Sequence, residues 1–447
     1  MKVKVKESSI VKPAKETPRH ILRSSILDLL VASFHLPSIY LYKANGSKKF
    51  FDTQLLKEAL SKCLVMFYPV AGRLRKREGG GGGLDIDCNG EGVLFLEAES
   101  EGVLDDFGDF TPCLDLFELI PPIDGSDESF SQPILMVQVT HFKCGGASLG
   151  VALQHTLVDG TSAIHFINAW SDFARGLSVI IPPFINRSLL CGQDPPSATY
   201  DHAEYVDPPP SMNNPVKANE YCEAHNQTSI ATGTSIATLK MTCDQLNNLK
   251  ANLNGDNKNQ ERYSTYEILA AHVWRCSCIA RGLADDQLTQ LQIPADGRYR
   301  LHPPLPPGYF GNVIFTTKST ALSGNLRSKP LKSTVGKIHD TLSRMDNDYL
   351  QSALDFLKSQ PDATALVRGA YILKYPNLNI ASWFRLPIHD ADFGWGRPIH
   401  MGPAIIPFAG LSFILPSPSG DGGLSLLICL EADHMEVFKT VFYDFEW

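Results

Sequence analysis

The chain has 447 residues, of which 43% are hydrophobic and 20% charged, as in ordinary globular proteins. This length predicts about two domains. The net charge of −8 argues against nucleic acid as a partner, and no apolar run is long enough to predict a membrane span. The first residues lack a signal-peptide pattern, and the ten cysteines show neither a zinc spacing nor a disulfide framework. We therefore expect a cytoplasmic protein without a metal site.

The first part of the chain alternates predicted strands and helices. Residues 1–7 alternate charge with valine and predict an edge strand. Residues 38–42 alternate like a strand, and Asp52 is expected to cap a helix over 53–64. The five glycines at 79–83 favour a flexible hairpin tip.

Further along the first part, two β-rich runs, 133–141 and 147–154, flank a hairpin turn, and a helix is predicted over 161–175.

The rest of the chain suggests a second α/β layer of similar size. We expect an N-terminal domain over 1–190, a proline-rich crossover over 191–228 and a C-terminal domain over 229–447. In the last of these we predict strands at 235–240, 411–415 and 424–431, and helices at 243–253, 266–281 and 434–442.

Charge is uneven along the chain. Residues 240–340 hold 13 Lys and Arg against 8 Asp and Glu, although the whole chain is acidic. A basic region within an acidic protein favours an anionic ligand bound there. A solvated face with chance enrichment is equally compatible with the charge alone.

The first chemical motif is His155-Thr-Leu-Val-Asp159-Gly160, directly after a predicted strand. Of the 13 histidines, only His155 has an Asp four residues later. The expected alternation of the strand ends at Gln154, which places His155 at a strand end that opens into a loop. A neutral imidazole there can take the proton of a hydroxyl that attacks an activated acyl group. A purely structural histidine is the alternative.

Asp159 has two possible roles. Its carboxylate could orient His155 as in a catalytic triad, or it could turn away to cap the next helix and pair with an arginine. We favour the structural role, with Arg298 of Asp296-Gly-Arg298 as the expected salt-bridge partner.

The second motif is Asp392-Phe-Gly-Trp-Gly396. Its two glycines and two aromatic residues favour a tight, packed turn over a catalytic loop. Asp392 could still act as a second base, but we favour a structural role for it.

Both motifs, in this order, resemble those of the plant BAHD acyltransferases, which move acyl groups from coenzyme A thioesters to alcohols or amines. The resemblance covers essentially the whole chain. Longer stretches resemble the members of this family that transfer hydroxycinnamoyl groups to shikimate or quinate. These stretches are residues 67–74, 87–93, 307–313, 345–349 and 385–398.

The resemblance implies an α/β fold of two chloramphenicol-acetyltransferase-like domains, each a mixed sheet with helices, and an active-site channel between them. It implies that His155 deprotonates the acceptor in a ternary complex, and that the basic region holds the coenzyme A phosphates. Ser38 and Tyr40 would line the acceptor side, and Trp383 would lie near the reacting carbonyl. Arg385 would bind the carboxylate of shikimate or quinate. For Arg385 a surface or interdomain salt bridge is the alternative.

The predicted function is therefore that of an acyltransferase. It would use p-coumaroyl-CoA or caffeoyl-CoA and a hydroxyl of shikimate or quinate. We expect a monomer with a coenzyme A thioester as co-substrate and no bound cofactor, nucleic acid or membrane span. The same donor with another alcohol or amine acceptor is the first alternative. A thioester hydrolase and a non-catalytic protein that binds coenzyme A esters are the others.

Two departures from the shikimate-type pattern concern the acceptor. Leu36 stands where those enzymes usually have Thr, and Ala381 precedes Ser-Trp383 where they also have Thr. The loss of two hydroxyl groups predicts a less polar acceptor pocket. The preferred acceptor is therefore left open, whereas the acyl donor is little affected.

Overall fold

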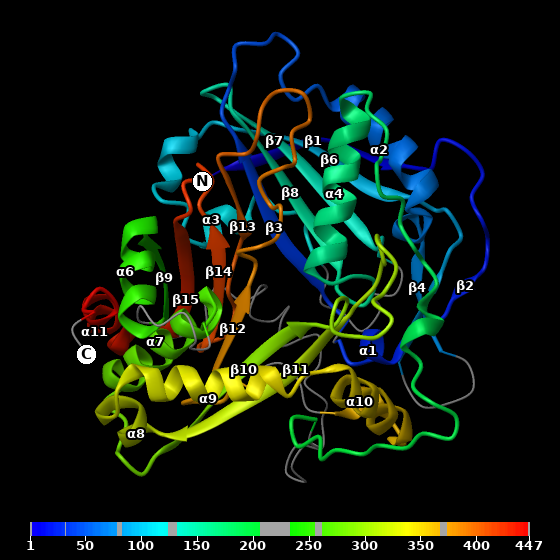
Figure 1. Ribbon diagram of the computed structural model, residues 1–447. Helices are drawn as coiled ribbons and strands as arrows, with labels where there is room; N and C mark the ends of the chain where they lie inside the picture. Colours follow the sequence, from blue (N-terminus) through cyan, green and yellow to red (C-terminus); the bar gives the residue numbers. More distant parts are fainter. Residues whose placement is uncertain are drawn as a thin grey trace.

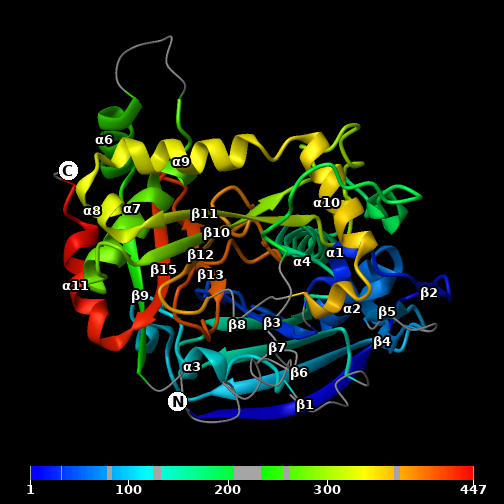
Figure 2. The ribbon, with the colours of Figure 1, turned by 90° about the horizontal axis from the view of Figure 1, so that it is seen from below.

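The computed structural model describes residues 2–31, 33–77, 83–123, 132–205, 233–254, 262–366 and 373–445. These residues form two six-stranded sheets and a small three-stranded sheet. Figures 1 and 2 show the two large sheets in neighbouring parts of the molecule, each with helices packed on it. None of the described helices has the length and apolar character needed to cross a bilayer. Most of the glycine run at 79–83, much of the crossover at 191–228 and residues 255–261 lie outside the described residues.

The first sheet contains most of the strands predicted in the N-terminal half. Its order is β1 (Val3–Val11), β6 (Val93–Ser100), β7 (Leu135–Phe142), β8 (Ala147–Gln154), β3 (His35–Tyr42) and β13 (His400–Pro403). β1 is the edge strand that its charge–valine alternation predicts. The alternation expected up to Gln154 is wrong, because β8 is buried along its whole length. Its Gly150 lies so close to the backbone that an added Cβ would be 2.0 Å from the Leu119 carbonyl oxygen.

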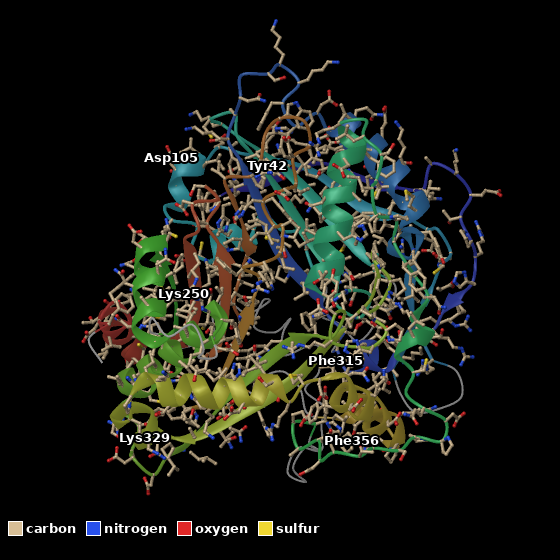
Figure 3. All side chains as sticks on the ribbon, viewed as in Figure 1. Tyr42, Asp105, Lys250, Phe315, Lys329 and Phe356 are labelled. Atoms are coloured by element: carbon tan, nitrogen blue, oxygen red, sulfur yellow. The ribbon has the colours of Figure 1, made fainter. Side chains whose placement is uncertain are left out.

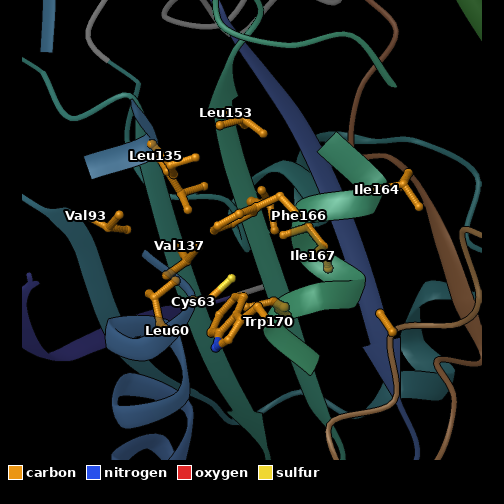
Figure 4. Packing of buried hydrophobic residues seen from close by; sticks show 14 of the residues in the cluster. Leu60, Cys63, Val93, Leu135, Val137, Leu153, Ile164, Phe166, Ile167 and Trp170 are labelled. Carbon is orange, nitrogen blue, oxygen red and sulfur yellow. The ribbon is translucent and has the colours of Figure 1, made fainter. Parts of the chain in front are cut away.

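Two long helices cover one face of this sheet. They are α2 (Thr53–Met66), which Asp52 caps as expected, and α4 (Gly160–Ala174). Ile164, Ile167 and Trp170 of α4 are all buried in the core cluster that also contains residues of the strands and of α2. In Figure 4, Trp170 lies between α4 and α2, whereas Ile164 lies on the side of α4 away from α2. The helix predicted over residues 161–175 is therefore confirmed.

The second sheet belongs to the C-terminal half. Its order is β11 (Ile314–Leu322), β10 (Leu288–Asp296), β12 (Leu378–Ser382), β14 (Leu411–Pro416), β15 (Leu424–Glu431) and β9 (Thr234–Met241). Its core is shared with helices α6 (Cys243–Asn254), α7 (Thr265–Ala280), α9 (Leu331–Ser343) and α11 (Ala432–Phe442). The strands and helices predicted in this half are confirmed, within one or two residues at most ends.

Shorter elements complete the described structure. The small sheet contains β2 (Ile21–Leu22), β5 (Leu84–Asp87) and β4 (Arg73–Lys76). The remaining α-helices are α1 (Ile26–Leu29), α3 (Leu114–Phe117), α8 (Ser323–Ser328) and α10 (Asn347–Ser359). Figure 3 locates Tyr42 on β3 in the upper part of the view, and Phe315 on β11 and Phe356 on α10 in the lower part.

One strand crosses between the two halves of the chain. β13 comes late in the sequence but pairs antiparallel with β3, with Gly402 opposite Ile39. A division at fixed residue numbers therefore cannot separate the two sheets completely. The boundaries at 190 and 229 stay a prediction.

Candidate active site

His155 follows directly after β8 and is partly exposed. Its backbone N–H donates to the Phe34 carbonyl oxygen at 3.0 Å, and its ring Nδ1 lies 3.0 Å from the Val158 carbonyl oxygen. A carbonyl oxygen can only accept a hydrogen bond, so Nδ1 carries the hydrogen of the neutral ring. Nε2 then carries the lone pair, and it is the nitrogen that can accept a proton.

The carboxylate of Asp159 does not orient the ring of His155. Asp159 is the N-cap of α4, where its carboxylate accepts the Ser162 N–H at 3.0 Å. It also accepts the Val313 N–H at 2.9 Å and two bonds from Arg298, at 2.8 and 2.9 Å. The ion pair expected from the sequence is present, and it is buried. Because a backbone carbonyl occupies Nδ1 of His155, the structure gives no support to a triad.

Arg298 ties the start of α4 to the second half of the chain. Besides Asp159, it donates to the Ser162 hydroxyl, the Gly311 carbonyl and the Asp296 carboxylate, at 2.9, 3.0 and 3.1 Å. Burial alone would lower the pKa of Arg298, but its pairs with the two carboxylates outweigh this and raise it. Burial also raises the pKa of Asp296. The guanidinium stays charged and holds the His155 loop and α4 against β10 and β11.

A small cavity of about 40 Å³ lies beside the His155 loop. Leu36, Ser38 and Tyr40 alternate on one face of β3 and line it, since every second residue of a strand shares a face. The second half of the chain contributes Trp383 and Leu386. Its other lining residues are Val151, Leu153, Val158, Gly160, Ala163, Ile164, Ile167 and Met401. The two halves therefore share this cavity.

The small cavity is almost entirely apolar. The side-chain polar groups of its lining residues are the hydroxyls of Ser38 and Tyr40 and the indole N–H of Trp383. Burial raises the pKa of Tyr40, so its phenol stays protonated and can donate a hydrogen bond. Leu36, which stands in place of the usual Thr, lines this cavity and adds an apolar side chain to it. Ala381, the other departure from the shikimate-type pattern, is not among the lining residues.

A larger cavity of about 530 Å³ lies in the C-terminal half. The exposed Arg385 lines it and forms no ion pair with any described residue. The salt bridge considered for Arg385 is thus absent from the described residues. Two arginines, Arg300 and Arg385, line this cavity together with two carboxylates, Glu267 and Asp296. Their charges balance, so the basic surplus of residues 240–340 is not concentrated in this cavity.

The segment between Ser382 and Leu386 separates the two cavities. Ser382, Phe384 and Arg385 line the larger one, whereas Trp383 and Leu386 line the smaller one. The structure therefore brings Ser38, Tyr40 and Trp383 together. It does not place Arg385 with them.

Asp392 lies at the other end of α4. Its Oδ1 accepts the N–H groups of Gly394 and Gly396 at 2.8 and 2.9 Å, and both glycines have positive φ. The neighbouring Phe393 packs on Trp170, with ring centroids 5.0 Å apart. Because an α-helix rises about 1.5 Å per residue, Trp170 lies about 15 Å along α4 from the His155 end. These contacts form a tight, packed turn, and a structural role for Asp392 stays a prediction.

A family model described as the Transferase family matches residues 1–445. The chain belongs to this family. It is 57% identical over 445 residues to the shikimate O-hydroxycinnamoyltransferase of Nicotiana tabacum, and the alignment covers all of both chains. It is 47% identical to a hydroxycinnamoyl-CoA:5-hydroxyanthranilate N-hydroxycinnamoyltransferase of Avena sativa, covering 99% of this chain and all of that one. The resemblance to the BAHD acyltransferases is thereby confirmed.

Solved structures of this type confirm the fold. The crystal structure of vinorine synthase matches with a TM-score of 0.71 at 22% identity, covering 98% of this chain and 96% of that one. A complex of F. sporotrichioides TRI101 with coenzyme A and T-2 matches with a TM-score of 0.69 at 19% identity, covering 92% and 95%. The protein is thus an α/β acyltransferase with two chloramphenicol-acetyltransferase-like domains.

As a BAHD acyltransferase, the protein uses a coenzyme A thioester as co-substrate.

Two groups at its candidate site have little or no signal in the sequence. The Val158 carbonyl that fixes the His155 tautomer is a backbone atom, so side-chain patterns do not reveal it. Ser162 accepts from Arg298 through its hydroxyl, and only its position three residues after the capping Asp159 hints at a role.

Proposed function

We propose that this acyltransferase moves a hydroxycinnamoyl group from coenzyme A to a hydroxyl of shikimate or a related carboxylated polyol such as quinate. The observation that carries the proposal is the geometry of His155, with Nδ1–H bound to the Val158 carbonyl and its loop lining a cavity shared by both halves. The acceptor is inferred from the 57% identity to the tobacco enzyme.

In the proposed reaction, Nε2 of His155 takes the proton of the acceptor hydroxyl as its oxygen forms a bond to the thioester carbonyl carbon. The carbonyl becomes a tetrahedral oxyanion near the indole N–H of Trp383. The carbon–sulfur bond then breaks, and the coenzyme A thiolate takes the proton from the imidazolium. No acyl-enzyme forms. The apolar walls of the small cavity suit an aromatic ring, and Ser38 and Tyr40 supply hydroxyls for hydrogen bonds to the acceptor.

Product analysis by mass spectrometry tests this function directly. Purified protein is supplied with p-coumaroyl-CoA or caffeoyl-CoA and with shikimate, quinate or 5-hydroxyanthranilate as acceptor. We expect esters of shikimate or quinate to dominate. An amide of 5-hydroxyanthranilate as the main product would favour the alternative acceptor, as in the Avena relative. Free p-coumarate released equally with and without acceptor would favour a hydrolase, and no turnover would favour a binding protein.

The His155→Ala variant tests the proposed base. Positioned general bases contribute about 10²- to 10⁴-fold, so kcat should fall by that factor while the KM values change little. An unchanged rate would remove His155 from the mechanism. His434→Ala is a suitable control, because this histidine lies on α11 in the second half.

The role of Arg385 separates two binding modes. We propose that its guanidinium, which has no ion-pair partner among the described residues, binds the acceptor carboxylate, although it lines the larger cavity. Arg385→Ala should then raise the KM for shikimate about ten- to a hundredfold, because a charge-assisted pair is lost. A rise in the KM for the acyl-CoA instead would assign Arg385, with Arg300, to a coenzyme A phosphate. Arg397→Ala, which removes an exposed arginine paired with Asp390, is the matched control.

We further propose that the enzyme acts as a cytoplasmic monomer. One chain supplies both walls of the small cavity, so the site needs no second copy. Light scattering on the purified protein should give the mass of a single chain, and a fluorescent fusion should stay in the cytoplasm. A stable dimer or an organellar signal would contradict this.

A further inference from the structure

We propose that Asn312, anchored with Arg187 on Asp28, is a positioning residue that holds the His155 loop in the geometry needed for proton transfer. This inference rests on the proposed function, because it assumes that His155 is the base. None of these three residues belongs to either sequence motif. Asn312 ends the stretch Tyr309-Phe-Gly-Asn312, which leads into β11. The carbonyl of Gly311 in this stretch accepts a hydrogen bond from Arg298.

Each carbonyl of residues 155–158 has a hydrogen-bond donor. Asn312 Nδ2 lies 2.9 Å from the His155 carbonyl oxygen and 3.4 Å from that of the next residue. Arg187 Nη2 donates to the Leu157 carbonyl at 2.6 Å. The fourth carbonyl accepts Nδ1–H of His155 itself. The carbonyl that selects the His155 tautomer is therefore part of a loop that is held along its whole length.

Both holding side chains meet on one buried carboxylate. Asp28 is fully buried in α1, and its Oδ1 accepts the backbone N–H and the side-chain Nδ2 of Asn312, at 3.0 and 2.8 Å. Its Oδ2 accepts Arg187 Nη1 at 2.7 Å and the Ser25 N–H at 2.8 Å. Asp28 and Arg187 neutralise each other, as buried charges require. The loop thus rests on segments that are far apart in the sequence.

The hydrogen-bond acceptors around Asn312 require the N–H donor of its amide group, and a side chain of the same shape without that donor would not satisfy them. Its Nδ2 faces three acceptors, whereas its Oδ1 is buried without a hydrogen-bond partner among the described residues. A carboxylate at this position would set negative charge against Asp28 and against the His155 carbonyl. Only a donor satisfies these neighbours.

Loss of this donor should act on proton transfer and not on substrate binding. With the first two carbonyls released, the loop can shift the Val158 carbonyl away from Nδ1 of His155. The ring can then rotate or adopt the tautomer that carries hydrogen on Nε2, which cannot accept a proton. None of the three network residues lines either cavity.

Steady-state kinetics of Asn312→Ala separate positioning from binding. We expect kcat to fall by about tenfold or more, with the KM values for p-coumaroyl-CoA and shikimate changed by less than about twofold. Asp355→Asn is the matched control, because this buried carboxylate of α10 accepts the backbone N–H groups of Gln193 and Ser197 and is not one of the groups that bind residues 155–158. The control should lower the melting temperature and leave kcat unchanged. If kcat follows the melting temperature in both variants, the inference is wrong.

A double-mutant cycle shows whether Asn312 acts through His155. In a His155→Ala background, Asn312→Ala should not lower the residual kcat further, because the group that it positions is gone. Additive losses would overturn the inference. Ring ¹⁵N spectra of histidine-labelled protein should show His155 with hydrogen on Nδ1 in the wild type and a mixture of tautomers in Asn312→Ala. An unchanged ring spectrum would likewise overturn it.

Two further outcomes keep this inference distinct from the proposed function. Full activity of His155→Ala would refute His155 as base, whatever Asn312 does. Loss of activity in His155→Ala with normal kcat in Asn312→Ala would refute only the positioning role. If Asn312→Ala does not fold, Asn312→Ser keeps a shorter donor, and it should show the same loss of kcat without a rise in KM.

Discussion

The two ends of α4 are tied to the second half of the chain by different forces. At the His155 end, Asp159 and Arg298 form a buried, bidentate ion pair with further hydrogen bonds. At the other end, Trp170 packs on Phe393, and Phe51 packs on Trp395. Hydrogen bonds are directional and fix atoms within narrow limits, whereas aromatic packing stabilises contact with less demand on direction. The reactive group lies at the end where positions are fixed by polar bonds.

Arg298→Ala should have the largest combined effect. It leaves the Asp159 carboxylate buried without its cation, which costs about 3–5 kcal/mol of unfolding free energy. The capped start of α4 and the adjoining His155 loop should loosen, so kcat should fall as well. Urea unfolding and steady-state kinetics measure the two effects. A stable variant with reduced kcat would show that the ion pair acts mainly on catalysis, and a destabilised variant with normal kcat would show that the His155 end of α4 does not fix the reactive group.

Phe393→Ala should cost as much stability without the loss of rate. Removal of a fully buried phenylalanine costs about 3–5 kcal/mol. Because this contact lies far along α4 from His155, kcat measured well below the melting temperature should stay within about twofold of the wild type. Tyr299→Ala, which removes a side chain that is 83% exposed, controls for the loss of an aromatic ring. If kcat fell as in Arg298→Ala, the two ends of α4 would not be independent.

The sequence predicted the parts of this picture that neighbouring residues encode. The α4 helix follows from its apolar spacing, the α2 cap from Asp52, and the pairing of Asp159 with Arg298 from complementary charge and a capping position. The remainder depends on residues that are far apart in the chain.

Three features could not be predicted for that reason. The placement of β13 beside β3, the covering of both faces of β8 and the position of Arg385 in the larger cavity are set by packing between distant segments. Periodicity in one segment cannot report which neighbour will cover it. The carbonyl that orients His155 has no side-chain signal at all.

The protein should become less stable at acid pH because of His35, which lies beside Gln154 under the His155 loop. Burial lowers the pKa of His35 to about 4, and its ring is held by the Pro133 carbonyl and the Gln154 amide. In the unfolded chain its pKa is about 6.5, so between these values the unfolded state binds more protons. The unfolding free energy should therefore fall by up to about 3 kcal/mol as the pH drops from 6.5 to 4.

The His35→Gln variant isolates this contribution. Glutamine does not titrate, so the slope of unfolding free energy against pH in this range should become shallower by up to one proton. Urea unfolding at several pH values measures the slope. Buried His272, whose pKa is also lowered to about 4, lies in the second half and supplies the comparison variant, His272→Gln. An unchanged slope in His35→Gln would mean that this ring is protonated in the folded state.

Asp392→Asn should have the smallest effect, and for that reason it discriminates best between the two roles of this residue. The amide oxygen of Asn can still accept the N–H groups of Gly394 and Gly396, so only the charge is lost. The cost should be below about 1 kcal/mol, and kcat and its pH profile should stay unchanged. A second base, by contrast, would contribute about 10²-fold or more to kcat and would move the acid limb of the profile. Because the aromatic end of α4 holds this carboxylate far from His155, we expect the variant to show that the motif fastens the two halves and takes no part in proton transfer.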